Sequence, residues 1–235
     1  RPEQATWLTA EQRRLVHEDL ARDAQLLGHR EHSIMASLKD RRLWLLVLIF
    51  FCLLCANSVL TFFAPSIVRE AGFKSVEAVG WITAVAYLLG AAGMIWNGAH
   101  SDRHQEVRYH FGLAALLGAL SLAVVATLIN VSPILTLVAM TLAIVGTMSA
   151  IPVFWQLPGR LLSGAAAAAG VALINSIANL AGAGAPYMTG LIKTATGQYS
   201  LAFYIIAVIE AVAVLLVLKF VPKLHTQPSG PDTFH

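Results

Sequence analysis

The residues best suited to chemistry lie between positions 149 and 193, in two otherwise apolar segments that carry Trp155, Gln156, Asn175 and Asn179. In hydrocarbon an unpaired polar group costs free energy, so these side chains must face protein or water. Asn175 and Asn179 stand four residues apart and therefore share one helix face. We interpret the two segments as helices that form one wall of a substrate path.

Other polar residues within apolar segments are weaker candidates. Asn57 and Thr61, also four residues apart, fit either hydrogen bonding between helices or the lining of a pore. The phenol of Tyr87 needs a partner on a neighbouring helix or in a cavity. Glu210 is the one acidic residue within these segments, and a central charge costs on the order of 3 kcal/mol. It is a functional candidate, unless it stays protonated or bonds a neighbour such as Tyr204 or Tyr87 and serves only the fold.

Cysteines and histidines give no reason to expect a metal site or a cofactor. Cys52 and Cys55 form a single CxxC inside an apolar run, whereas a zinc site usually needs four ligands and a redox pair an accessible thiolate. We interpret both as packing residues. All eight histidines lie outside the apolar runs. The apolar segments hold no paired acids or Ser/His arrangement, so we expect no enzyme.

Composition identifies the elements that must position these residues. The chain has 235 residues, of which 57% are hydrophobic and 12% charged, against roughly 25% charged residues in a soluble domain. We therefore predict an all-α membrane protein with a bundle of six transmembrane helices over residues 43–221. A span needs about 20 apolar residues, and the candidates are 43–64, 78–98, 111–129, 133–157, 161–191 and 200–221.

The basic residues follow the topology of such a bundle. Eight Lys and Arg fall in residues 1–42, two in 99–110, one at Arg160 and two after Leu218, thirteen in all, against three in the alternate connections. This asymmetry places both ends of the chain in the cytoplasm. The net charge of +3 is thus a topology signal, and nucleic acid is not expected as a partner.

The flanks of the bundle are polar. In residues 1–42, Thr9 and Gln12 have the spacing of a capping box, which predicts a linker helix in a cytoplasmic loop. The tail 222–235 is rich in Pro, Gly and polar residues and is expected to be cytoplasmic and disordered. Since the sequence begins with Arg1 and has a long polar lead, it looks like the interior of a longer protein.

Prolines suggest where helices start, bend and stop. Pro65 is expected to close the first span and Pro158 the fourth. Ser132 and Pro133 have the residue types of an N-cap and a first helical position. Pro152 is expected to kink the fourth span.

The connection 99–110 places an acid beside bases, in Asp102, Arg103 and Arg108. These charges are suited to capping helix ends and to pairing across the inner membrane surface. Nothing nucleophilic or metal-binding is expected to accompany them, so a catalytic role is not predicted.

Several long stretches resemble a known family. The likeness rests on RPEQATWLTAEQRRLVHEDL, SLKDRRLWLLVLIFF, GWITAVAYLLGAAGMIWNGAHSDR and FWQLPGRLLSGAAAAAGVALINSIANLAGAGAPYMTGLIKTATGQYSLAFY. These resemble the anion:cation symporter family of the major facilitator superfamily, and within it the bacterial permeases of tartrate, phthalate, glucarate and hydroxyphenylacetate type. The resemblance implies a carboxy-terminal half, spans seven to twelve, whose partner is an amino-terminal six-helix half.

The resemblance also implies a function. Substrate would lie between the halves, with access alternating by rocking, and the substrates would be sugar acids, dicarboxylates or aromatic acids carried with protons across a bacterial inner membrane. The coupling carboxylates and the substrate-gripping arginine would belong to the other half, leaving Glu210 as this half's coupling candidate. Trp155, Gln156, Asn175 and Asn179 match positions that contact substrate, and Asn57 and Tyr87 are added from position alone. A membrane sensor derived from a permease is the alternative.

Two departures from the family pattern stand out. Val107 replaces a basic residue in the 99–110 connection, which weakens the cluster of charges there. Ala185 replaces the glycine expected before Pro186 and Tyr187, a small change at a close contact.

Overall fold

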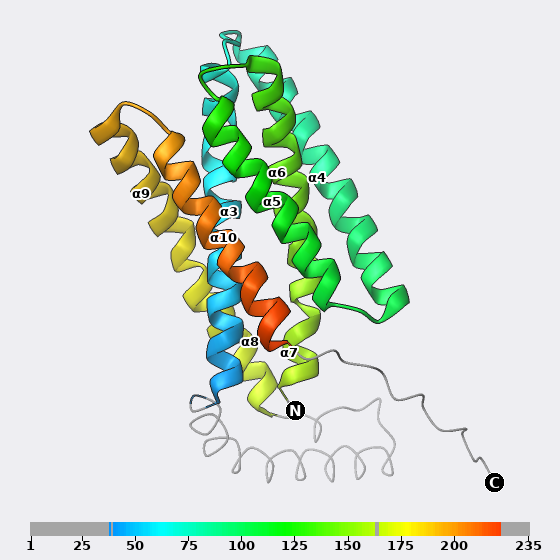
Figure 1. Ribbon diagram of the computed structural model, residues 1–235. Helices are drawn as coiled ribbons and strands as arrows, with labels where there is room; N and C mark the ends of the chain where they lie inside the picture. Colours follow the sequence, from blue (N-terminus) through cyan, green and yellow to red (C-terminus); the bar gives the residue numbers. More distant parts are fainter. Residues whose placement is uncertain (1–37, 39, 163–164, 222–235) are drawn as a thin grey trace, which may run out of the picture.

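The computed structural model describes residues 38, 40–162 and 165–221. All regular structure in this part of the chain is helical, which confirms the predicted all-α membrane class. The predicted linker helix and the tail lie outside the described residues. The bundle in Figure 1 consists of α3 (Arg41–Glu70), α4 (Val76–His104), α5 (Arg108–Leu128), α6 (Pro133–Phe154), α7 (Gln156–Leu161), α8 (Ala165–Ala178), α9 (Leu180–Thr196) and α10 (Ser200–Phe220).

Helix α3 is the central element of the bundle. It contacts α4, α6, α8, α9 and α10, because apolar residues surround it on nearly all sides and a helix of that kind is buried. Leu46, Ile49 and Leu53 have no exposed surface. On one side of α3 stand α8 and α9, and on the other α4, α5 and α6 (Figure 1).

The closest helix approach joins α5 to α6 at two glycines. A Cβ added to Gly146 would lie 2.4 Å from the backbone nitrogen of Gly118 and 2.7 Å from the carbonyl oxygen of Ala114. Small residues of this kind allow membrane helices to pack backbone against backbone. Helix α10 packs against α5 as well, so these three helices form a compact group.

The described spans agree with most of the predicted ones. Five helical segments are long and apolar enough to cross a membrane, namely α3, α4, α5, α6 together with α7, and α10. Helix α6 begins at Pro133 with Ser132 as its N-cap, as predicted. The predicted span 161–191 is built differently, because α8 and α9 follow one another along one side of the bundle with an interruption at Asn179.

Two proline predictions are wrong. Helix α3 does not end at Pro65 but continues to Glu70, since a proline removes one backbone hydrogen bond and membrane helices tolerate that loss. The fourth span does not stop at Pro158, which lies in the first turn of α7, where proline is acceptable. The helix is instead interrupted at Trp155, three residues after Pro152, close to the predicted kink.

Charged residues separate between the two ends of the bundle. Lys193 and Glu70 form an ion pair of 2.8 Å where α9 and α3 end, and Arg69 and Lys74 lie near this end. The other end, where α3 begins, collects a larger basic set, consisting of Arg41, Arg42, Arg103, Arg108, Arg160 and Lys219.

Candidate functional site

The two asparagines predicted to share a helix face lie at the junction of α8 and α9. The Asn179 side chain donates from Nδ2 to the backbone carbonyl of Asn175 at 2.7 Å and to Asn175 Oδ1 at 3.1 Å. The backbone N–H of Asn179 donates to the same carbonyl at 3.0 Å. A side chain that competes for a helix carbonyl disturbs the helix. The asparagine pair therefore marks the interruption in this membrane segment.

Both asparagines are exposed on the described bundle. The core-facing side of the same segment packs through Ile174, Ala178 and Ala181, each at most 1% exposed. Lipid offers no hydrogen-bond partner to an amide. The exposed side of α8 and α9 must accordingly meet water or protein.

Tyr187 extends this exposed face and was missed by the sequence reasoning. It lies on α9, twelve residues beyond Asn175, and its side chain is 70% exposed. The repeat of four, through Asn175, Asn179, Ala183 and Tyr187, is the signal that could have found it.

Trp155 and Gln156 lie at the junction of α6 and α7. The indole of Trp155 is half-buried and packs edge-on against Phe50 and Phe154, with ring centroids 4.9 and 5.5 Å apart. Gln156 donates from Nε2 to Ser101 Oγ at 3.4 Å and accepts from Arg160 at 3.3 Å. Gln156 thus ties α7 to the end of α4.

The fold brings the two asparagines together but does not join them directly to Trp155. Within the described residues, no hydrogen bond or ring contact links Trp155 to either asparagine. Trp155 packs against the core cluster that includes Ile174 and Ala178, the neighbours of the asparagines in sequence. The two parts of the predicted site therefore approach the same core from different helices.

Asn57 and Tyr87 occupy partly buried positions on α3 and α4. The backbone carbonyl of Asn57 accepts a 2.7 Å hydrogen bond from Thr61 Oγ1, within α3. The Tyr87 hydroxyl is buried and has no hydrogen-bond partner in the described part of the chain. A phenol in that condition needs water or a ligand to satisfy it.

Glu210 is fully buried between α5, α6 and α10. Thr147 donates to its Oε1 at 2.8 Å, so the partner is Thr147 rather than the suggested Tyr204 or Tyr87. Its Oε2 has no partner among the described residues. A Cβ on Gly118 would lie 2.6 Å from Oε1, so the glycine makes room for the carboxyl. An acid at this depth is costly to the fold unless its charge is paired.

The charged residues of the 99–110 connection take different positions. Asp102 and Arg103 are exposed, and the backbone carbonyl of Asp102 accepts from Gln105 Nε2 at 2.8 Å. The Arg108 guanidinium donates to the carbonyl of Leu218 near the end of α10. Arg108 therefore binds a helix C-terminus, where cations are favourable.

Glu106, which the sequence reasoning passed over, organises the start of α5. Its carboxylate accepts from the backbone N–H of Tyr109 at 2.8 Å and of His110 at 3.2 Å. Burial acts to raise the pKa of Glu106, but these hydrogen bonds and the His110 side chain outweigh burial and lower the pKa. The carboxylate is the cap that this helix otherwise lacks.

Comparison with known proteins places the fold in a large family. Residues 5–186 match the Major Facilitator Superfamily. A putative tartrate transporter of Agrobacterium vitis is 37% identical over 226 residues, which cover 95% of this chain and 50% of that protein. The putative metabolite transport protein NicT of Pseudomonas putida is 33% identical over 94% of this chain and 51% of its own length. A quinolone resistance transporter of Acinetobacter baumannii is 31% identical over 94% of this chain and 51% of its own length.

The chain spans about half the length of the curated relatives it matches. About half of each of these relatives therefore lies outside the matched region.

Proposed function

Because this chain belongs to the Major Facilitator Superfamily, we propose that it forms the carboxy-terminal half of a permease for small organic anions. In this proposal a second six-helix half completes the transporter, and the substrate binds between the halves. Access then alternates as the halves rock against each other. The names of the relatives, which include a tartrate transporter, favour a carboxylate among the possible substrates.

The observation that carries the proposal is the exposed asparagine pair on an interrupted membrane helix. Irregular backbone at membrane depth is tolerated where it is covered by protein or lines a water-filled cavity. Asn175 and Asn179 are exposed on the side of α8 and α9 that points away from the core of this half. A cavity shared with the other half supplies both the water and the cover that these amides need.

Each predicted site residue receives a role in this proposal. The amide N–H groups of the asparagines donate to carboxylate or hydroxyl oxygens of the substrate. Trp155 stacks on the face of a sugar acid or an aromatic acid, and Gln156 holds α7 in place beside it. The unpartnered hydroxyl of Tyr87 and the polar groups of Asn57 contribute further contacts, through water or directly.

The proposal also covers the coupling of transport to protons and the orientation of the protein in the membrane. Uptake is driven by protons, with Glu210 as the candidate proton carrier of this half. The protein lies in a bacterial inner membrane with residues 1–42 and 222–235 in the cytoplasm. The larger basic set at the end of the bundle where α3 begins supports this orientation.

The test replaces Asn175 in the full-length protein. Asn175→Ala removes an amide from the proposed cavity but leaves the core side of α8 unchanged, so we expect normal expression and a loss of at least tenfold in uptake of the acid. Radiolabelled tartrate and a panel of sugar and aromatic acids would be followed in cells or proteoliposomes.

Asn130→Ala is the matched control, because Asn130 is an exposed asparagine in the turn between α5 and α6. We expect uptake to remain within twofold of the unmodified protein. Unchanged uptake in Asn175→Ala would remove Asn175 from the site. The sensor alternative predicts that the unmodified protein moves none of the acids although it binds one.

A further inference from the structure

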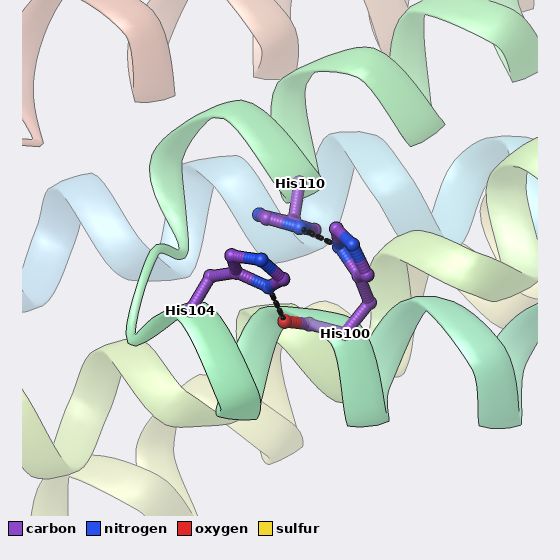
Figure 2. Close-up of side chains that lie close together, drawn as sticks. All are labelled: His100, His104 and His110. Atoms are coloured by element: carbon purple, nitrogen blue, oxygen red, sulfur yellow. Dashed lines mark hydrogen bonds between the residues drawn. The ribbon is translucent and has the colours of Figure 1, made fainter.

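Three histidines come together where α4 ends and α5 begins (Figure 2). His100 and His104 lie one turn apart on α4, and His110 lies in the first turn of α5. Their candidate ligand nitrogens all lie within 4.8 Å of one another. The cluster lies in the 99–110 connection, where the sequence analysis expected nothing metal-binding.

Two of the three rings are already held in the form that binds a metal. His110 Nδ1 lies 2.7 Å from Glu106 Oε2, and His104 Nδ1 lies 2.9 Å from the backbone carbonyl of His100. An Nδ1–H that donates to an oxygen leaves the Nε2 lone pair free. Carboxylate and carbonyl acceptors behind metal-binding histidines have this arrangement, which fixes the tautomer and the ring orientation.

The third contact shows where an ion would enter. His100 Nδ1 and His110 Nε2 are 2.6 Å apart, so one proton must lie between them. Tetrahedral coordination with Zn–N bonds of about 2.0–2.1 Å places neighbouring nitrogens about 3.3 Å apart. A small separation of the two rings would let an ion replace that shared proton.

We propose that His100, His104 and His110 bind one divalent transition-metal ion of the zinc class at this end of the bundle. Imidazole nitrogens suit Zn²⁺, Cu²⁺ and Ni²⁺, whereas Mg²⁺ and Ca²⁺ require oxygen ligands. His104 is exposed, so an ion can reach the site from solvent and keep a water as its fourth ligand. The bound ion links α4 to α5.

The residues around the three histidines hold the rings in place, which is typical of a metal site rather than of a chance grouping. His100 and His110 are half-buried, and Trp96 stacks on the His100 ring with centroids 5.4 Å apart. The Glu106 carboxylate is anchored by two backbone N–H groups of α5. These contacts limit the freedom of the ligands before an ion binds, which favours affinity.

The experiment measures Zn²⁺ binding to the full-length protein, purified through a tag that contains no histidine. The chain has five histidines outside the cluster, so the protein is compared with its own triple variant, His100→Gln, His104→Gln and His110→Gln. We expect the triple variant to bind one Zn²⁺ fewer per chain, measured by competition with a chromophoric chelator, and excess Mg²⁺ to leave binding unchanged.

Single variants test the geometry. Each His→Gln change should weaken Zn²⁺ binding at least tenfold, and Glu106→Gln should weaken it about tenfold to a hundredfold by releasing His110. Asp102→Asn is the matched control, because Asp102 lies between the histidines in sequence but outside the cluster, and should change affinity less than twofold. Equal binding by the unmodified protein and the triple variant would overturn the proposal.

A second readout needs no substitution and therefore does not depend on how the variants fold. Co²⁺ added to the unmodified protein should give the intense visible absorption of a four-coordinate nitrogen site. Only the weak absorption of six-coordinate Co²⁺ would also overturn the proposal. Neither result depends on whether the protein transports an organic anion.

Discussion

At the scale of single residues, the buried carboxyl of Glu210 has two candidate roles, one in the fold and one in proton transfer. Thr147 provides its one hydrogen bond among the described residues, and Gly118 provides the space in which it fits. An acid in this position can serve the fold alone or can carry a proton during transport. The two roles make different predictions for the same substitution.

Glu210→Gln keeps an acceptor for Thr147 and a neutral side chain, but it cannot release a proton. If Glu210 carries the coupling proton, the variant should exchange labelled for unlabelled acid at a normal rate yet lose at least tenfold of its uphill accumulation under a pH gradient. Proteoliposomes allow both measurements on one preparation.

The exchange of labelled for unlabelled acid requires a folded transporter, so a variant that fails to fold is recognised by the loss of exchange. Glu77→Gln, at the exposed start of α4, should change neither activity. Full uphill accumulation in Glu210→Gln would assign the carboxyl to the fold.

At the scale of elements, contact between α5 and α6 determines how the bundle holds Glu210. The backbones of these helices meet at Gly118 and Gly146, where a Cβ on Gly146 would come within 2.4 Å of a backbone atom. Backbone cannot move aside as the end of a flexible side chain can. The two helices must therefore separate if either glycine gains a side chain.

Gly146→Ala should destabilise the protein by about 1–3 kcal/mol through overpacking, and it should displace Thr147 from Glu210. Thermal unfolding in detergent, followed by fluorescence during size exclusion, would detect a fall of several degrees. Gly190→Ala on α9 is the control, since a Cβ there meets nothing within 4 Å. An equal effect of both changes would show that glycine flexibility, rather than the helix contact, matters.

At the scale of the whole molecule, the distribution of charge predicts orientation. The basic residues divide thirteen to three between alternate connections, and the fold gathers the described ones at opposite ends of the bundle (Figure 1). Cytoplasmic loops carry such an excess. The predicted orientation follows from the bundle as a unit rather than from any one helix.

Cysteine labelling tests this orientation. Lys74→Cys and Gln198→Cys should react with a membrane-impermeant maleimide in intact cells, because they lie at the end with few basic residues. Asp102→Cys should react only after permeabilisation. Cys52 and Cys55 are buried, so their own reaction with the maleimide should be weak. Any exposed cysteine in the rest of the full-length protein would first be replaced by serine. The reverse labelling pattern would contradict the predicted topology.

The sequence by itself determined the membrane class, the approximate extent of most spans and the separation of charge between the ends. These properties depend on runs of neighbouring residues, because the cost of placing a polar group in lipid acts on each segment separately. The spacing of Asn175 and Asn179 predicted a shared helix face, because residues four apart lie one turn apart on a helix. It did not predict that the helix is interrupted at Asn179.

The tertiary structure decided which distant residues meet. Glu210 and Thr147 are 63 positions apart, and nothing in the sequence distinguishes Thr147 from other membrane threonines as its partner. His110 lies near His100 and His104 because the short connection after His104 places the start of α5 beside the end of α4, so histidines of two helices form a candidate set of ligands. Such contacts depend on how helices pack, and packing is a property of the assembled bundle.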